Sequence, residues 1–151
     1  MRVSHEQLHE LLQYCMDFAR TMLEDSGDFY PFGASITADG KLVAVGGNNG
    51  EERPNPQEIY KLLGGAFTSG AQNGELFAAA LAANVNVPPQ YSSPSPDALR
   101  VHLESDGYSR FIYVPYRLQK RGLFKNKRVA EFSEPFAVEV GPTFFVPKGN
   151  G

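Results

Sequence analysis

Two histidines near the start of the sequence have the spacing of a zinc site. In His5-Glu6-Gln7-Leu8-His9 the imidazoles stand four residues apart, and a glutamate directly follows the first. On a helix both histidines would lie on one face and bind Zn²⁺, while the glutamate would act as general base on a metal-bound water. The pattern gives one hypothesis for function, a zinc-dependent hydrolase with His5 and His9 as ligands.

The position of this motif favours a second interpretation. It opens at the fifth residue, in the first turn of an expected helix, where a metal site would lack a formed wall. His5, Glu6 and His9 would then belong to the polar face of that helix. We therefore expect no cofactor and a non-catalytic protein, with the hydrolase kept as the alternative.

Two further side chains with catalytic chemistry have simple structural interpretations. Cys15 falls within the apolar stripe of the first expected helix, which predicts a buried thiol instead of a nucleophile. His102 alternates with apolar residues and stands between Arg100 and Glu104, so we expect a solvated ladder of polar side chains on its strand. No serine or cysteine nucleophile motif accompanies this histidine.

Aromatic and basic residues provide the candidate binding surfaces. Residues 111 to 116 form a continuous aromatic and β-branched run, so this strand is either covered on both faces or presents one face to a partner. Residues 117 to 128 contain several lysines and arginines, which predicts a hairpin loop with solvated charges, and binding of an acidic partner or of RNA is the alternative. The candidate binding residues are Tyr30, Phe32, Phe111, Tyr113, Tyr116, Arg117, Lys120 and Arg121.

Helices and strands must position these residues, and the sequence marks the first of them. Ser4 and Gln7 form a capping box, and apolar residues then recur every three or four positions, which predicts a helix that ends near Gly27. Residues 29 to 45 predict a strand, a two-residue Asp39-Gly40 turn and a second strand.

A helical region is expected in the middle of the chain. Residues 55 to 58 read Asn-Pro-Gln-Glu, which is typical of a helix start. The alanine-rich residues 75 to 83 predict a further, buried helical stretch, because alanine has the highest helix propensity. The prolines between residues 88 and 96 exclude a helix or a central strand there and mark a connector.

Strands are expected after this connector, over residues 99–104, 111–116 and 129–140, with a short edge strand possible at 143–146. We predict a single α+β domain over residues 1–151, with 148–151 as a loose tail. Its sheet would be five-stranded and mainly antiparallel, in two hairpin-linked blocks with helices packed on it. The order would be helix, strand, strand, helical region and three strands.

Composition limits the classes of partner. Fourteen Lys and Arg against seventeen Asp and Glu give a net charge of -3, so no nucleic-acid partner is expected. The sequence has no apolar run long enough to span a membrane, and its first residues lack the apolar core of a signal peptide. The single cysteine excludes an internal disulfide. We expect a cytoplasmic protein.

Part of the sequence resembles the cytidine-deaminase fold. Residues 30 to 34 (Tyr-Pro-Phe-Gly-Ala), the Asp39-Gly40 turn and Glu75 carry this resemblance, which covers roughly the first half of the chain. It implies a zinc-bound hydroxide held by a His or Cys two residues before the glutamate and by a Pro-Cys-x-x-Cys turn. Asn73 stands at the first ligand position and no cysteine follows it, so the resemblance implies a related scaffold without deaminase activity.

The chain also resembles uncharacterised small bacterial proteins. The amphipathic first helix, residues 29–33, the Asp39-Gly40 turn, residues 97–99 and residues 114–116 carry that resemblance, and they imply structure only. We therefore expect a non-catalytic protein-binding or regulatory protein of the immunity type. Its ligand would be a protein partner or a second copy of the chain.

Overall fold

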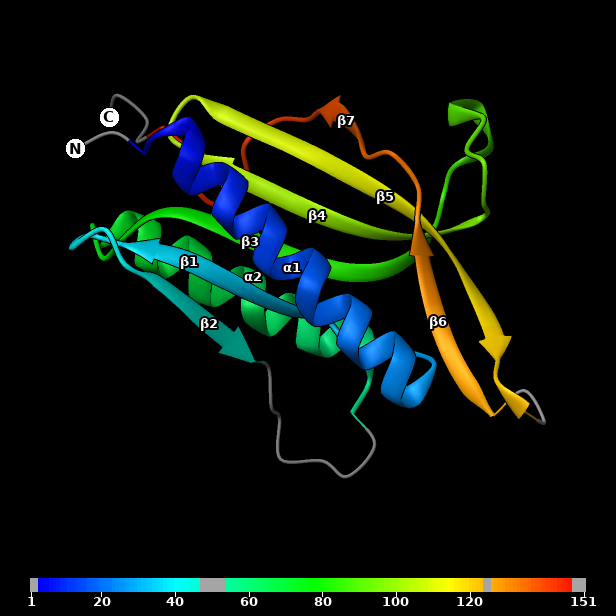
Figure 1. Ribbon diagram of the computed structural model, residues 1–151. Coiled ribbons are helices and arrows are strands. Elements are labelled where there is room, and N and C mark those ends of the chain that lie inside the picture. The colour runs from blue at the N-terminus through cyan, green and yellow to red at the C-terminus, as the bar shows by residue number, and fades with distance from the viewer. Residues whose placement is uncertain (1–2, 47–53, 124–125, 148–151) are drawn as a thin grey trace.

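The computed structural model describes residues 3–46, 54–123 and 126–147, so the expected tail at 148–151 lies outside the described residues. Two helices lie on opposite faces of one curved antiparallel sheet (Figure 1). The predicted α+β class is confirmed. In chain order the elements are α1 (His5–Ser26), β1 (Phe32–Thr37), β2 (Leu42–Gly46), α2 (Pro56–Gln72), β3 (Leu76–Asn86), η1 (Pro89–Tyr91), β4 (Asp97–Ser105), β5 (Tyr108–Arg121), β6 (Lys127–Phe132) and β7 (Phe136–Glu139).

Over the described ranges the sheet has seven strands, so the prediction of five was wrong. Its order is β2-β1-β3-β4-β5-β6, and β7 also pairs with β5. One additional strand comes from the alanine-rich region. The other arises because the expected strand over residues 129–140 is divided into β6 and β7 around Pro135, whose ring nitrogen cannot donate to a ladder.

The expected helical stretch at residues 75–83 is instead β3, a central strand of the sheet. Ala80 pairs with Ala34 of β1 on one side and with Leu103 of β4 on the other. Ala78, Ala80 and Ala82 belong to the core beneath α1, while Ala79 and Leu81 belong to the core beneath α2. Small side chains suit a strand that is covered on both faces, and this tertiary setting overrides the helix propensity of alanine.

Helix α1 begins and ends where the sequence predicts. The Ser4 hydroxyl accepts the N–H of Gln7 at 3.1 Å, and the Gln7 side chain accepts the N–H of Ser4 at 2.9 Å, which completes the capping box. The helix ends at Gly27, whose φ of 80° is costly for residues with a Cβ.

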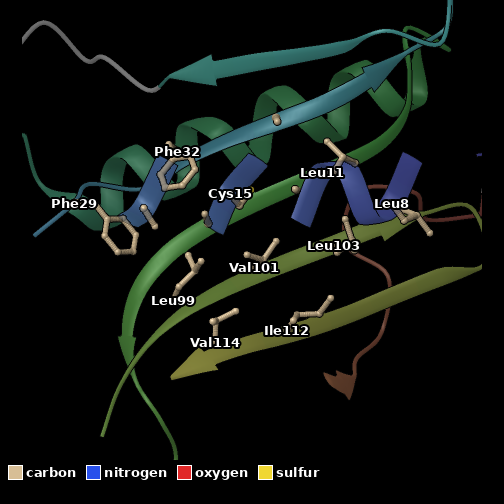
Figure 2. Close-up of a cluster of buried hydrophobic side chains, with 14 of the residues drawn as sticks. Leu8, Leu11, Cys15, Phe29, Phe32, Leu99, Val101, Leu103, Ile112 and Val114 are labelled. Atoms are coloured by element: carbon tan, nitrogen blue, oxygen red, sulfur yellow. The ribbon is translucent and has the colours of Figure 1, made fainter. Parts of the chain in front are cut away.

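The core under α1 is shown in Figure 2. Leu8, Leu11 and Cys15 point from the helix toward Val101 and Leu103 of β4. The predicted burial of Cys15 is confirmed, and this burial raises the pKa of its thiol to about 12. On the other face of the sheet, a second core contains Ile59, Leu63, Phe67, Ala79, Leu81 and Phe144.

The β1–β2 hairpin has a three-residue loop, not the expected two-residue turn. Thr37 N–H donates to the carbonyl of Lys41 at 2.9 Å, and Gly40 N–H donates to the carbonyl of Thr37 at 2.8 Å. Gly40 has a φ of 84°. This geometry is a type I turn closed by a glycine bulge, the usual form for a three-residue hairpin loop.

Strand β5 is long enough to pair with different partners along its length. Residues 108–115 pair with β4, residues 110–113 also pair with β7, and residues 116–121 pair only with β6. The β5–β6 ribbon therefore extends past the end of β4 (Figure 1). Helix α1 supports it, because the Glu24 carboxylate accepts the N–H of Ala130 at 2.9 Å.

None of the helices in the described part of the chain is long and apolar enough to cross a membrane.

Candidate binding site around Arg100

Arg100 is the central residue of the candidate site, on the side of β4 that faces away from α1. Its guanidinium carbon lies 4.4 Å from the ring centre of Phe111 and 5.6 Å from that of Tyr60 on α2. An Nη atom donates to the Tyr60 hydroxyl at 3.1 Å. Two aromatic faces thus hold a half-buried cation in one orientation.

The charge of Arg100 has no carboxylate partner among the described residues. No Asp or Glu in residues 3–46, 54–123 and 126–147 forms an ion pair with it. Its Nε is buried and has no hydrogen-bond acceptor in that part of the chain. A partly desolvated cation without a carboxylate partner is unusual, because the burial of its charge costs free energy that a partner normally offsets.

A cleft with a volume of about 980 Å³ opens beside Arg100. Residues 27–31, the first turns of α2, residues 83–86 of β3, and Tyr116 and Leu118 of β5 line it. Tyr30 is 50% exposed at this cleft, and the Lys61 side chain is exposed on α2. The cleft therefore combines aromatic surface with two cationic side chains.

A chain of hydrogen bonds fixes one wall of the cleft. The Tyr116 hydroxyl donates to the Asn84 side-chain carbonyl at 2.7 Å, and the Asn84 amide donates to the Asp28 carboxylate at 2.7 Å. The N–H of Phe29 donates to the same carboxylate oxygen of Asp28 at 2.7 Å. Burial raises the pKa of Tyr116, so it stays a neutral donor at physiological pH.

Aromatic rings continue from Arg100 across the sheet. Phe111 and Tyr113 lie 6.5 Å apart, and Tyr113 stacks on Phe136 of β7 at 5.1 Å. Tyr91 of η1 covers both Tyr113 and Phe136, at 5.7 Å and 5.8 Å. We call Tyr60, Tyr91, Phe111, Tyr113 and Phe136 the aromatic face; Phe111 and Phe136 in it are half-buried and Tyr113 is buried.

The structure distributes the sequence-predicted binding residues over several places. Tyr30 and Tyr116 line the cleft, and Phe111 and Tyr113 belong to the aromatic face. Phe32 is instead buried under α1, where its ring packs 4.4 Å from that of Phe18.

The predicted basic residues lie apart from these, on the exposed β5–β6 ribbon. Arg117 donates to the carbonyl of Pro94 at 2.8 Å, and Arg121 pairs with Glu131 at 2.7 Å. Lys120 is exposed, whereas Phe124 and Lys125 lie outside the described residues. Part of the cationic charge of the ribbon is thus already engaged within the chain.

The expected solvated ladder around His102 was wrong. His102 is 4% exposed and Glu104 is fully buried, because the segment after β7 covers this part of the sheet. The Glu104 carboxylate accepts the N–H groups of residues 143, 144 and 145. Residues 143–146 therefore form no edge strand, since their donors bind a side chain instead.

His102, Glu104 and Ser109 contain the residue types of a hydrolytic triad without its geometry. His102 Nε2 lies 3.0 Å from Glu104 and 3.1 Å from the Ser109 hydroxyl, so one ring nitrogen contacts both groups. A triad needs the acid on one nitrogen and the nucleophile on the other. Ser109 is also buried, and its hydroxyl lies 3.2 Å from Glu104, so the cluster serves to hold the chain together.

The histidine pair of the zinc hypothesis lies on the exposed surface of the first turns of α1. His5, Glu6 and His9 are all exposed. Within the described ranges, no group of three or more His, Cys, Asp or Glu side chains is arranged to hold a metal ion. The structure thus supplies no third protein ligand for this pair from the described residues.

Sequence reasoning did not identify Arg100 as a functional residue. Its setting depends on Tyr60, 40 residues earlier, and on Phe111, which a single strand pattern cannot bring together. The signal available in the sequence was the alternation of Arg100, His102 and Glu104 with apolar residues, which places the three side chains on one side of the strand. The structure then shows that positions 102 and 104 are buried.

Comparison with known proteins gives no relative for this chain: no family model, no curated protein and no solved structure matches it.

Proposed function

We propose that this chain is a non-catalytic protein-binding protein, and that its partner places an acidic side chain on Arg100. The observation that carries this proposal is the half-buried Arg100 guanidinium, held between two aromatic rings beside an open cleft with no carboxylate of its own among the described residues. Arginine and tyrosine are the residue types that most often dominate the energy of protein interfaces.

The cleft and the aromatic face fit a peptide segment that carries both acidic and apolar side chains. A carboxylate on Arg100 would form a charge-assisted hydrogen bond and offset the desolvation of the cation. Tyr30 and Tyr60 offer large flat surfaces for a neighbouring apolar side chain. Aromatic side chains lose little conformational entropy when they bind.

Two acidic residues of the cleft limit where the partner's charge can lie. Asp28 is already bonded to Asn84 and to the backbone. Asp97 also lines the cleft, and it precedes Arg100 by three residues of extended strand, which is a separation of about 10 Å. A ligand carboxylate would therefore be repelled from that end of the cleft and directed toward Arg100 and Lys61.

We further propose a regulatory role of the immunity type, in which the chain acts by binding to its partner and occupying a site on it. The single buried cysteine fits a reducing compartment, and we propose the cytoplasm as its location. Neither proposal uses His5 or His9.

A peptide array tests the binding proposal directly. It would carry matched sets of peptides that differ only in Asp and Glu against Asn and Gln, each combined with aromatic or aliphatic neighbours. We expect the chain to retain a subset of the acidic apolar peptides. The affinity of the amide-matched peptides should be lower by a factor of about ten or more. Arg100→Met should lose this retention, whereas Arg121→Met should keep it.

The same array separates two competing results. If Arg121→Met or Arg117→Ala abolishes retention while Arg100→Met does not, the β5–β6 ribbon is the binding surface and the role of Arg100 is disproved. Failure of every peptide set to bind would count against the protein-binding proposal itself. Circular dichroism of each variant would show that the fold is retained.

A further inference from the structure

The outer edge of β2 is a row of backbone groups with no partner among the described residues. Within residues 3–46, 54–123 and 126–147, β2 pairs with β1 alone, and no described strand lies along its other side. In an antiparallel ladder, every second residue of a strand exchanges backbone hydrogen bonds with the neighbouring strand. Thr37 N–H donates to the Lys41 carbonyl, so in β2 the residues that form hydrogen bonds with β1 are Val43 and Val45. Leu42, Ala44 and Gly46 therefore direct their N–H and C=O groups outward.

The two edges of this sheet differ in how they are protected from other strands. The far edge is formed by β6 and by the four-residue β7. β6 carries Lys127, Arg128 and Glu131, β7 ends in Glu139, and charged side chains and short strands on an edge discourage further pairing. β2 reads Leu-Val-Ala-Val-Gly and has no charge, no proline and no bulge within its five residues. An apolar edge of this kind pairs with another strand unless something covers it.

Exposed apolar side chains lie beside this edge on both faces of the sheet, the one covered by α1 and the one covered by α2. Val43 on β2 itself is 43% exposed. On α1, Phe18 is 38% exposed and lies against Phe32, the register partner of Gly46. Phe18 extends the apolar surface beyond the strand on the α1 side, whereas Val43 lies on the α2 side, the same side as Val45.

Leu62 extends the apolar surface on the α2 side, where it is 51% exposed. It follows Tyr60 by two residues, which is about 200° around a helix. Tyr60 points to Arg100 on β4, so Leu62 lies on the opposite flank of α2, toward β1 and β2.

We propose that the chain forms a homodimer in which β2 pairs antiparallel with β2 of a second copy, with the two-fold axis at Ala44. The edge is complementary to itself in this register, because Ala44 meets Ala44 and Leu42 meets Gly46 of the other copy. An uncharged edge brings no like charges together on pairing. Phe18 and Leu62 enlarge the contact beyond the backbone ladder, as a stable dimer requires.

A second copy fits this edge better than an unrelated partner does. Isologous pairing satisfies the same outward groups on both chains at once and closes the assembly at two subunits. The two sheets would join into one continuous antiparallel sheet. The proposed site around Arg100 lies on the other flank of α2, so this pairing is independent of the proposed function.

Cysteine cross-linking tests the register. Opposed residues in a hydrogen-bonded antiparallel pair have Cα atoms about 5.5 Å apart, which a disulfide can bridge. We expect Ala44→Cys to form a covalent dimer on mild oxidation. Val43→Cys is the matched control, because its counterpart in the other copy would lie diagonally, about 8 Å away. Cys15 is buried and contributes no background.

Light scattering tests the surface without cross-linking. The wild-type chain should scatter with twice the mass of one chain, and Leu62→Glu should shift it to the single-chain mass, since a charge would be buried in the contact. Val146→Glu, at a side chain that is 52% exposed elsewhere, should remain a dimer.

Three outcomes would overturn the proposal. One is a wild-type chain that keeps the single-chain mass at every concentration up to its solubility limit. Another is equal cross-linking of Ala44→Cys and Val43→Cys, which random collision would give. The third is a dimer that survives Leu62→Glu and is not captured by Ala44→Cys, which would place the contact on another surface.

Discussion

The backbone N–H of Phe144 donates a 2.7 Å hydrogen bond to the carboxylate of Glu104, 40 residues earlier in the sequence. The same carboxylate also accepts the N–H groups of Thr143 and Phe145, so one buried side chain holds the whole segment after β7 against β4. This segment brings the Phe144 ring into the core beneath α2, 5.6 Å from Phe67.

Replacing Glu104 with glutamine should destabilise the fold by about 3 kcal/mol, because an amide NH₂ would face buried donors that now share two oxygens. Urea unfolding at neutral pH measures this as a lower midpoint. Glu139→Gln is the control, since its 3.7 Å ion pair with Arg110 is at the surface and should change stability by less than about 0.5 kcal/mol. Equal effects of the two substitutions would contradict the role of Glu104.

The contribution of Glu104 should disappear in acid. Burial raises its pKa, but hydrogen bonds from His102 and from the backbone of residues 143–145 outweigh burial and hold the pKa below its ordinary value of 4.5. The unfolded chain then binds this proton more readily than the folded chain does. The stabilisation is therefore complete above pH 4.5 and is lost as the pH falls through the lowered pKa.

Unfolding midpoints of the wild type and Glu104→Gln, measured from neutral pH downward, check this prediction. The gap between them should narrow once the pH falls below 4.5. A gap that stays constant into that range would show that the charge of Glu104 is not what stabilises the segment.

Gly33→Ala should destabilise the fold by about 1 to 3 kcal/mol, because a Cβ there would lie 2.6 Å from the carbonyl oxygen of Ala80 and 2.7 Å from the Phe67 ring. Gly65→Ala in α2 is the matched control, with no atom within 4 Å of its new Cβ. That control should stabilise the helix by about 0.5 to 1 kcal/mol. Thermal unfolding of both variants should therefore shift in opposite directions.

Arg128→Ala should lower stability by about 0.5 to 1 kcal/mol, because its guanidinium donates to the carbonyl of Asp25 at 3.0 Å, at the negative end of α1. The loss should shrink in high salt, which screens this interaction. Lys127→Ala removes a neighbouring exposed charge and should have little effect. If the two variants behave alike at low salt, the contact with the helix end contributes nothing.

The sequence predicted the elements whose signals are local. The Ser4–Gln7 capping box and the Asn55-Pro56 start both occur in the structure, where the Asn55 side chain accepts the N–H of Gln57. Those signals depend only on neighbouring backbone groups. The alanine run of β3 was mistaken for a helix, because the two helices that make its small side chains necessary come from distant segments.

The candidate site was less predictable than the fold. Strand alternation places Arg100, His102 and Glu104 on one side of β4, but it cannot show that a segment 40 residues later buries two of them. The exposure of Arg100 beside a cleft depends on where α2 and the loop at residues 27–31 lie across the sheet. These are tertiary relationships, and no local pattern reports them.

The alanines of β3 also determine how cooperatively the protein unfolds. Ala79 and Ala80 are successive residues of one strand, and they are buried in different cores, Ala79 under α2 and Ala80 under α1. The side chains of β3 between α1 and α2 are small. Loss of either helix would therefore expose to water the backbone of the same strand that supports the other helix. The two cores should therefore melt together in a single cooperative transition, although they lie on opposite sides of the sheet.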